Sequence, residues 1–265
     1  MTGTHSLCWS WGRTLVGAGL LIFATGCAGP SNSVADAYES KPRNPAEAYA
    51  NLGRQYLLRD SLDLALTRLQ RAIRLNPDLP AAHHDLAVVY SKMGNLDAAG
   101  DEYRIALKLI PRDPTTLYNY ATLLYNQGNY SEAETQLQTL ISNPTADNRT
   151  QAYEALGLIA IKLGDSAKAE GYLEQSLRTD ANQPRALLEL AQIALDGGRL
   201  PQAKNYFRRY QEIVHDTPEG LWFGVLLERA QGDDRMVADY SQRLRVKFPD
   251  SPQARQLYAE RINRQ

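Results

Sequence analysis

Few side chains in this 265-residue sequence are suited to nucleophilic or metal chemistry, since it has only two cysteines and four histidines. The most suggestive arrangement is the adjacent pair His83 and His84, directly followed by Asp85. Consecutive positions on a helix point to different sides, however, so the two imidazoles are poorly placed to share one ion. The sequence also contains no GxSxG, HExxH, P-loop or CxxC pattern. It therefore predicts no catalytic residue and no metal site, and the protein is not expected to be an enzyme.

Cys27 indicates a different chemistry because of the residues that precede it. Arg13 is followed by an apolar run of 12 residues, 15–26, whereas a membrane-spanning helix needs about 20. A cation, a short apolar core and then small residues form the pattern of a secretory signal peptide. Ala24, Thr25 and Gly26 stand directly before Cys27, so the stretch resembles the bacterial lipobox. The resemblance implies cleavage before Cys27 and attachment of a diacylglycerol and an N-acyl chain to it. An ordinary signal peptide with an incidental cysteine is the alternative.

The lipobox divides the N-terminal part of the sequence into two predicted segments. Residues 1–26 would be the lipoprotein signal peptide, and residues 27–45 the lipidated N-terminus and a flexible tether rich in Ser, Pro, Asn and Gly. The part of the tether after Cys27 has a root-mean-square reach of roughly 21–25 Å. Residue 28 is Ala rather than Asp, which by the sorting rules of lipoproteins implies the periplasmic face of the outer membrane. Apart from the lipid on Cys27, no cofactor is expected.

Composition narrows the possible partners. Lys and Arg number 29 against 30 Asp and Glu, giving a formal net charge of −1, and no basic block occurs along the chain. Nothing therefore favours a nucleic-acid partner. Because both cysteines lie near the N-terminus, the stability of the body must come from packing rather than from disulfides.

A repeat begins at residue 46. Glycines recur at intervals of 34, 36, 34 and 34 residues, namely Gly94, Gly128, Gly164, Gly198 and Gly232. A 34-residue period of paired helices is typical of tetratricopeptide repeats. The sequence predicts an all-α, right-handed superhelical solenoid of six such helix pairs over residues 46–250. Residues 251–265 are predicted to form a helix that caps the last apolar face.

Each block of the repeat carries small and large residues at fixed positions. Position 8 of a block, on its first helix, and position 20, on its second helix, are small, as in Gly53 and Ala65 of the block that starts at residue 46. Position 24 is large, as in Leu69. The small residues let the two helices approach, and the large one fills the remaining space. Glycine at position 15 is expected in the turn, where a positive φ is needed. The sixth block departs from this pattern, with Gly224, Val225 and Val237 at packing positions.

In tetratricopeptide stacks the first helix of each pair lines a concave groove. The residues at the inward positions are mostly apolar or aromatic, whereas a purely solvated face would be charged. Such a patch favours binding of a protein partner. Curvature of the solenoid, or the tether, could instead bury part of it. The predicted partner-binding residues are Arg54, Leu57, His84, Val88, Tyr118, Thr122, Tyr125, Leu158, Ile161, Leu188, Leu195 and Trp222.

The order of lipobox, short polar tether, six repeats and capping helix resembles the type IV pilus biogenesis lipoproteins of the PilF/PilW family, the secretin pilotins. Three stretches carry the resemblance: EAYANLGRQYLLRDSLDLALTRLQRAI, LYNYATLLYNQGNYSEAETQL and YEALGLIAIKLGDSAKAEGYLEQSLRTDANQPRALLELAQIAL. It implies a monomer, anchored in the outer membrane, that binds secretin subunits through its groove and promotes their localisation and multimer assembly. No small-molecule substrate is implied.

Two other functions remain open from the sequence. One is a lipid-anchored scaffold for another envelope machine, serving β-barrel insertion or recruitment of peptidoglycan enzymes. It would share the fold and the anchor, so only the partner distinguishes it. The other is an enzyme or enzyme subunit, for which a strongly polar set of residues would have to converge in the groove.

Overall fold

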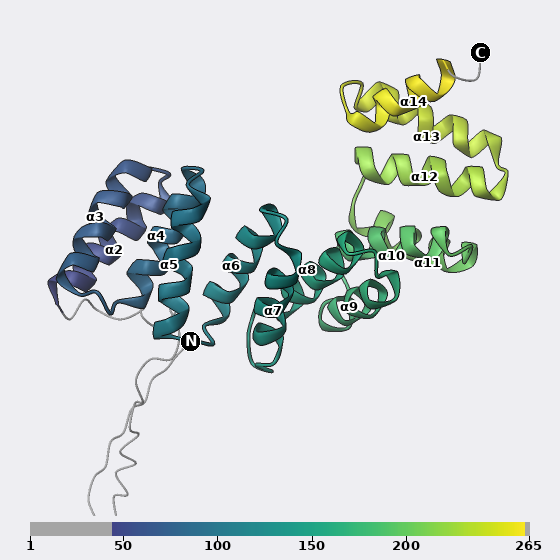
Figure 1. Cartoon of the computed structure of the whole chain (residues 1–265). Helices are drawn as coiled ribbons and strands as arrows, with labels where there is room; N and C mark the ends of the chain where they lie inside the picture. Colours follow the sequence, from purple (N-terminus) through teal and green to yellow (C-terminus); the bar gives the residue numbers. More distant parts are fainter. Residues whose placement is uncertain (1–43, 263–265) are drawn as a thin grey trace, which may run out of the picture. The chain divides into compact units, whose positions relative to one another are not determined.

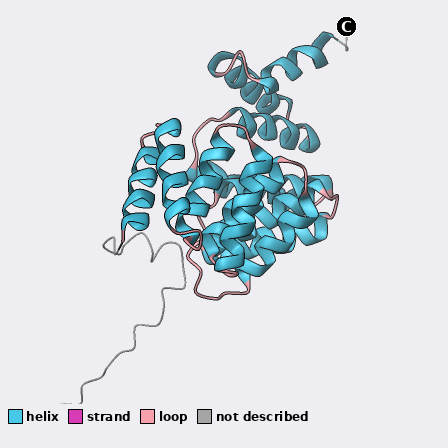
Figure 2. Ribbon diagram, turned by 60° about the vertical axis from the view of Figure 1, so that its left-hand side comes forward, coloured by secondary structure: helices cyan, strands magenta, loops and turns pink. Residues whose placement is uncertain are grey.

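The computed structural model describes residues 44–262, and all regular structure in this range is helical. Cys27, the predicted signal peptide and nearly all of the predicted tether lie outside the described residues. Figures 1 and 2 show the helices following one another as antiparallel pairs. The pairs are α2 (Pro45–Leu58) with α3 (Leu62–Leu75), α4 (Pro80–Lys92) with α5 (Leu96–Leu109), α6 (Pro114–Asn126) with α7 (Tyr130–Ile141), α8 (Arg149–Lys162) with α9 (Ser166–Thr179), α10 (Pro184–Asp196) with α11 (Leu200–Ile213), and α12 (Pro218–Gln231) with α13 (Asp234–Lys247); α14 (Pro252–Ile262) follows alone.

This arrangement confirms the predicted tetratricopeptide fold. Each second helix packs against the first helix of the next pair, and α14 packs on both α12 and α13, where the sequence predicts a cap. Proline begins five of the six first helices, where its fixed φ suits a helix start and its missing N–H is not needed. Side-chain caps help fix several starts, as where Asp113 accepts the backbone N–H of Thr116.

The turns within pairs confirm the predicted role of glycine. The five recurring glycines all have a positive φ, between 70° and 80°. The first pair differs, because Asp60 occupies this position with a φ of 56°. Asp is one of the few side chains that tolerate the left-handed region. Its carboxylate accepts a hydrogen bond from Lys92 of the next pair, at 2.7 Å.

Close approach within pairs depends on the small residue at position 8. A Cβ on Gly157 would lie 2.6 Å from Cγ of Leu173, and one on Gly53 would meet Leu69 at the same distance. Neither glycine can therefore gain a side chain unless the opposing leucine moves. The pairing of small position 8 with large position 24 thus follows the prediction.

The sixth pair keeps this contact but shifts it by one residue. Here Gly224, at position 7, faces the ring of Tyr240, at position 23, and an added Cβ would lie 2.9 Å from that ring. The usual positions 8 and 24 carry Val225 and Ser241 instead. Since the small and the large residue have both moved by one place, α12 and α13 still fit together.

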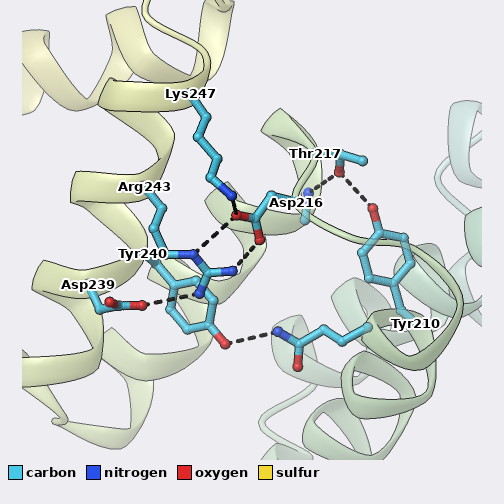
Figure 3. Close-up of polar contacts among 9 residues, drawn as sticks. Tyr210, Asp216, Thr217, Asp239, Tyr240, Arg243 and Lys247 are labelled. Carbon is cyan, nitrogen blue, oxygen red and sulfur yellow. Dashed lines mark hydrogen bonds and ion pairs between the residues drawn. The ribbon is translucent and has the colours of Figure 1, made fainter.

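The last two pairs are also joined by a polar cluster, drawn in Figure 3. Asp216, in the link between α11 and α12, accepts hydrogen bonds from Arg243 and from Lys247, both on α13. Arg243 also reaches Asp239 at 3.1 Å. The hydrogen bond from Arg243, followed by that from Lys247, outweighs burial and holds the pKa of the Asp216 carboxyl below its usual value. The cluster therefore fixes α13 to the link that precedes its own pair.

Candidate partner-binding groove

The first helices of the middle pairs border two neighbouring hollows. One lies between α4, α5 and α6, has a volume of about 230 Å³, and is called the Val88 hollow here. The other lies between α6 and α8, has a volume of about 170 Å³, and is called the Tyr118 hollow. Thr122 and Asn126 of α6 line both, so the two hollows adjoin across this helix. The Val88 hollow also includes Ser91, Tyr103, Asn119 and Leu123, and the Tyr118 hollow Tyr125, Gln151, Glu154, Leu158 and Arg185.

The hollows bring together five of the predicted groove residues: Val88, Tyr118, Thr122, Tyr125 and Leu158. Of these, Leu158 is the most buried, with 9% of its surface exposed. The remaining predicted residues do not line these two hollows. Among them, the partly buried ones are Arg54, Ile161, Leu188, Leu195 and Trp222.

The structure corrects the placement of two predicted residues. Leu57 belongs to the hydrophobic core of the first pairs rather than to an open surface. His84 is only 4% exposed, because its two ring nitrogens contact Thr116 and Asn119 of α6 and its ring packs edge-on against Tyr103. Its side chain therefore lies behind the groove, between two pairs, and does not line it.

Sequence reasoning missed several residues of the hollows, among them four with polar side chains: Asn119, Asn126, Gln151 and Arg185. Gln151 and Arg185 occupy position 2 of their blocks, which is an inward position, so the repeat pattern contained the signal. Asn119 and Asn126 stand at positions 6 and 13, seven residues apart, and so lie on one face of α6. Their amide side chains, in a helix otherwise rich in aliphatic and aromatic residues, were the available clue.

Comparison with known proteins extends this result. Models of tetratricopeptide repeats match residues 53–94, 84–148, 118–184 and 154–216. The type IV pilus assembly protein PilF of Pseudomonas aeruginosa is 30% identical over 245 residues, which cover 91% of this chain and 96% of that protein. The chain belongs to the PilF family of tetratricopeptide repeat proteins.

Solved structures agree with membership of the PilF family. A structure from a functional study of Pseudomonas aeruginosa PilF has a TM-score of 0.73 and 30% identity, covering 82% of this chain and 97% of that one. A crystal structure of PilW, described as a widely conserved type IV pilus biogenesis factor, has a TM-score of 0.72 and covers 82% and 100%. At 24% identity, the likeness to PilW shows the fold alone.

The Tyr118 hollow of this PilF-family chain has a charged edge. Burial raises the pKa of Glu154; the positive charge of Arg185 opposes this rise, and the negative charge of Glu189 adds to it. Burial also raises the pKa of Glu189, and the positive charges of Arg185 and Lys162 oppose that rise. The pKa of Tyr118 is raised by burial and then by Glu154. The hollow thus combines an apolar floor with partly desolvated charges of both signs, an arrangement that suits a protein segment with a polar and an apolar side.

The adjacent histidines face different neighbours. His83 contacts Glu102 at 2.6 Å and the carbonyl of Pro77 at 2.8 Å. Burial alone would lower the pKa of His83, but these two hydrogen bonds, together with the charges of Glu102 and Asp78, outweigh burial and raise the pKa. Burial lowers the pKa of His84 to about 4, so this imidazole is neutral near pH 7. Within the part of the chain that the structure describes, no three His, Cys, Asp or Glu side chains are grouped as metal ligands.

None of the described helices combines the length and the apolar character that crossing a membrane requires.

Proposed function

We propose that this protein is an outer-membrane lipoprotein of type IV pilus biogenesis that binds secretin subunits in its groove. Binding would promote the localisation of these subunits and their assembly into multimers. The observation that carries the proposal is the similarity to the type IV pilus assembly protein PilF, which extends over 91% of this chain and nearly all of that protein.

The groove supports a binding role for the α4, α6 and α8 face. Its two adjoining hollows present half-buried apolar surface, including Val88, Tyr118 and Tyr125, beside polar groups. Partly exposed aromatic side chains are the residues that contribute most when a partner covers them. A protein that binds the assembly-competent form of a subunit raises the population of that form by mass action.

The lipid anchor on Cys27 is part of the same proposal and rests on the lipobox. Several acyl chains on one residue would keep the protein at the membrane, whereas a single chain gives only marginal binding, at about 10⁴ M⁻¹. Confinement to the surface where the secretin assembles would raise the effective concentration of each for the other.

Two variants test the proposal in cells that make pili. Cys27→Ala is expected to leave the membrane fraction and to reduce the heat-resistant secretin multimers seen on gels, because the anchor is lost. Thr122→Glu is expected to keep the protein at the membrane but to weaken its crosslinking to the secretin subunit, because Thr122 is exposed and borders both hollows. A matched control is Thr135→Glu, an exposed position on α7 outside both hollows.

Unchanged multimers with Cys27→Ala would overturn the role of the anchor. Unchanged crosslinking with Thr122→Glu would overturn the role of the groove. Crosslinking of the wild-type protein to a β-barrel insertion component or a peptidoglycan enzyme, in place of the secretin, would replace the proposed partner.

A further inference from the structure

Asn119 stands out among the groove residues because its side chain is held from behind. It lies on α6 and lines the Val88 hollow, and its amide nitrogen is 3.3 Å from Nε2 of the buried His84. Asn126 lies seven residues further along the same helix, on the same face, and borders both hollows. Its side chain has no hydrogen bond to another described residue. One of the two groove asparagines is therefore fixed and the other is free to turn.

The hydrogen bonds behind Asn119 have a direction that donor and acceptor chemistry determines. The carboxylate of Asp113 accepts from the hydroxyl of Thr116 at 2.7 Å and from the backbone N–H of Thr116 at 2.8 Å. Thr116 has one hydroxyl hydrogen, which goes to Asp113. Its oxygen can then only accept from His84 Nδ1, 2.9 Å away. His84 consequently carries its proton on Nδ1.

This tautomer determines which atom of Asn119 faces the groove. With the proton on Nδ1, Nε2 of neutral His84 has a lone pair and accepts a hydrogen bond. The group of Asn119 that meets it must be the amide NH₂, in agreement with the contact at Nδ2. The carbonyl oxygen Oδ1 is then directed away from His84, and it makes no hydrogen bond with the described part of the chain. Burial of Asp113, Thr116 and His84 excludes competing water from the relay.

We propose that Asn119 Oδ1, oriented by the Asp113–Thr116–His84 relay, accepts a backbone N–H from an extended segment of the protein partner. The inference rests on the proposed function, since it specifies how the groove holds its partner. An extended segment fits because its backbone N–H groups are free, whereas those of a helix beyond its first turn are already bonded. The apolar wall formed by Val88 and Leu123 would take a neighbouring side chain. His84, Thr116 and Asp113 are positioning residues and do not touch the partner.

The orientation can be measured without any partner. Long-range ¹⁵N–¹H correlation spectra distinguish the two tautomers of a histidine, and the full chain has only four histidines. His84 of the full-length protein in detergent is expected to show the Nδ1–H form. Thr116→Ser, which keeps the hydroxyl, should preserve this form. Thr116→Val, which has the same shape without a donor or acceptor, should change the His84 signals. An Nε2–H form in the wild type would overturn the relay.

Binding tests the consequence, with the purified periplasmic region of the secretin subunit from the same organism as the probe. Asn119→Ala is expected to weaken binding about fivefold, the effect of losing one hydrogen bond. Thr116→Val should weaken it about threefold, and Thr116→Ser should keep wild-type affinity.

Double variants test whether Thr116 acts through Asn119. If it does, adding Thr116→Val to Asn119→Ala should not weaken binding further. Added to Asn126→Ala, which has no link to the relay, Thr116→Val should keep its full effect. Thermal unfolding identifies variants that fail to fold.

The outcomes separate the two proposals. No binding by the wild-type protein would overturn the proposed function, and this inference with it. Normal binding by the wild type together with equal binding by Asn119→Ala would overturn this inference alone. Independent effects of Thr116→Val and Asn119→Ala would show that the relay stabilises the fold without positioning Asn119.

Discussion

Several polar side chains of the Tyr118 hollow are left open, whereas those around α12 and α13 bind one another. In the Tyr118 hollow, Gln151, Glu154 and Arg185 make no hydrogen bond to other described side chains. At the other region, Asp216 holds Arg243 and Lys247, and the hydroxyl groups of Tyr210 and Thr217 lie 2.7 Å apart (Figure 3). The same repeat thus serves two purposes. Polar groups left open suit recognition, and polar groups paired with each other hold the end of the stack together.

The largest expected difference between the regions concerns their aromatic residues. Phe207 is 3% exposed and packs against the rings of Tyr210, Phe223 and Tyr240. Phe207→Ala should lower the free energy of unfolding by about 3–5 kcal/mol, the usual loss for a buried ring. Tyr118→Ala, at the half-buried edge of a hollow, should lower it by no more than about 1.5 kcal/mol. Urea denaturation measures both. Equal losses would remove the distinction between a packed end and an open middle.

The next effect tests the close approach of helices in the middle pairs. Gly157→Ala should lower the free energy of unfolding by about 1–3 kcal/mol, because its Cβ would clash with Leu173. Gly224→Ala should lower the free energy of unfolding by a similar amount, because the contact of Gly224 with Tyr240 takes the place of the contact of Gly157 with Leu173. Gly171→Ala is the matched control, since this exposed glycine of α9 has no other atom within 4 Å of the added Cβ. It should raise the free energy of unfolding by about 0.5–1 kcal/mol. A stabilised Gly157→Ala protein would contradict the packing described.

The paired charges of the end region predict a dependence on pH. Asp216→Asn should lower the free energy of unfolding by roughly 1–2 kcal/mol near pH 7, since Asp216 binds two cations. Because the folded-state pKa of Asp216 is depressed, its contribution is present above the unfolded pKa of about 3.9 and is lost as pH falls through the folded value. The difference from wild type should therefore shrink below about pH 4.

A control for this effect is Asp101→Asn, which breaks an exposed pair with Arg104. It should change the free energy of unfolding by no more than about 0.5 kcal/mol. A difference between Asp216→Asn and wild type that stays constant down to pH 2 would show that charge pairing is not its cause.

The smallest effect concerns the first turn. Asp60→Gly removes the strain of a side chain at positive φ, worth about 1 kcal/mol, but also removes the exposed pair with Lys92. Asp60→Gly is therefore expected to raise the free energy of unfolding by a net amount of about 0.5 kcal/mol, measured by thermal or urea unfolding. In a Lys92→Met background, where the pair is already absent, the same substitution should raise the free energy of unfolding by the full amount of about 1 kcal/mol. A lower free energy of unfolding in that background would mean that the turn is not strained.

The periodic features of this fold follow from the sequence because each has a local cause. The turn glycines reflect a required φ, and Gly157 against Leu173 reflects the distance between two helix axes. The helix pairs could therefore be predicted closely. The shift in the sixth pair could not, because reading position 7 in place of position 8 requires knowing that Tyr240 turns toward Gly224.

The groove was less predictable because inward position does not determine exposure. His84 occupies an inward position, yet Thr116 and Asn119 of the following pair enclose it. Conversely, Asn119 and Asn126, at positions 6 and 13, directly follow positions 5 and 12, which the repeat pattern marks as inward, and they line the hollows. Such contacts depend on how successive pairs are placed, and a period of 34 residues contains no information about that placement.

Thr122 and Asn126 form a ridge shared by both hollows, and this ridge implies a spacing rule for ligands. A helix with its side chains is about 10–12 Å across, and an extended chain advances about 3.3 Å per residue. Side chains of an extended chain alternate between its two faces, so a strand crossing α6 would fill the two hollows with side chains four residues apart. The rule can be tested with synthetic peptides that carry two bulky apolar residues at that separation, compared with peptides in which the two residues are adjacent. The difference in affinity would identify the sequence motif that this surface binds.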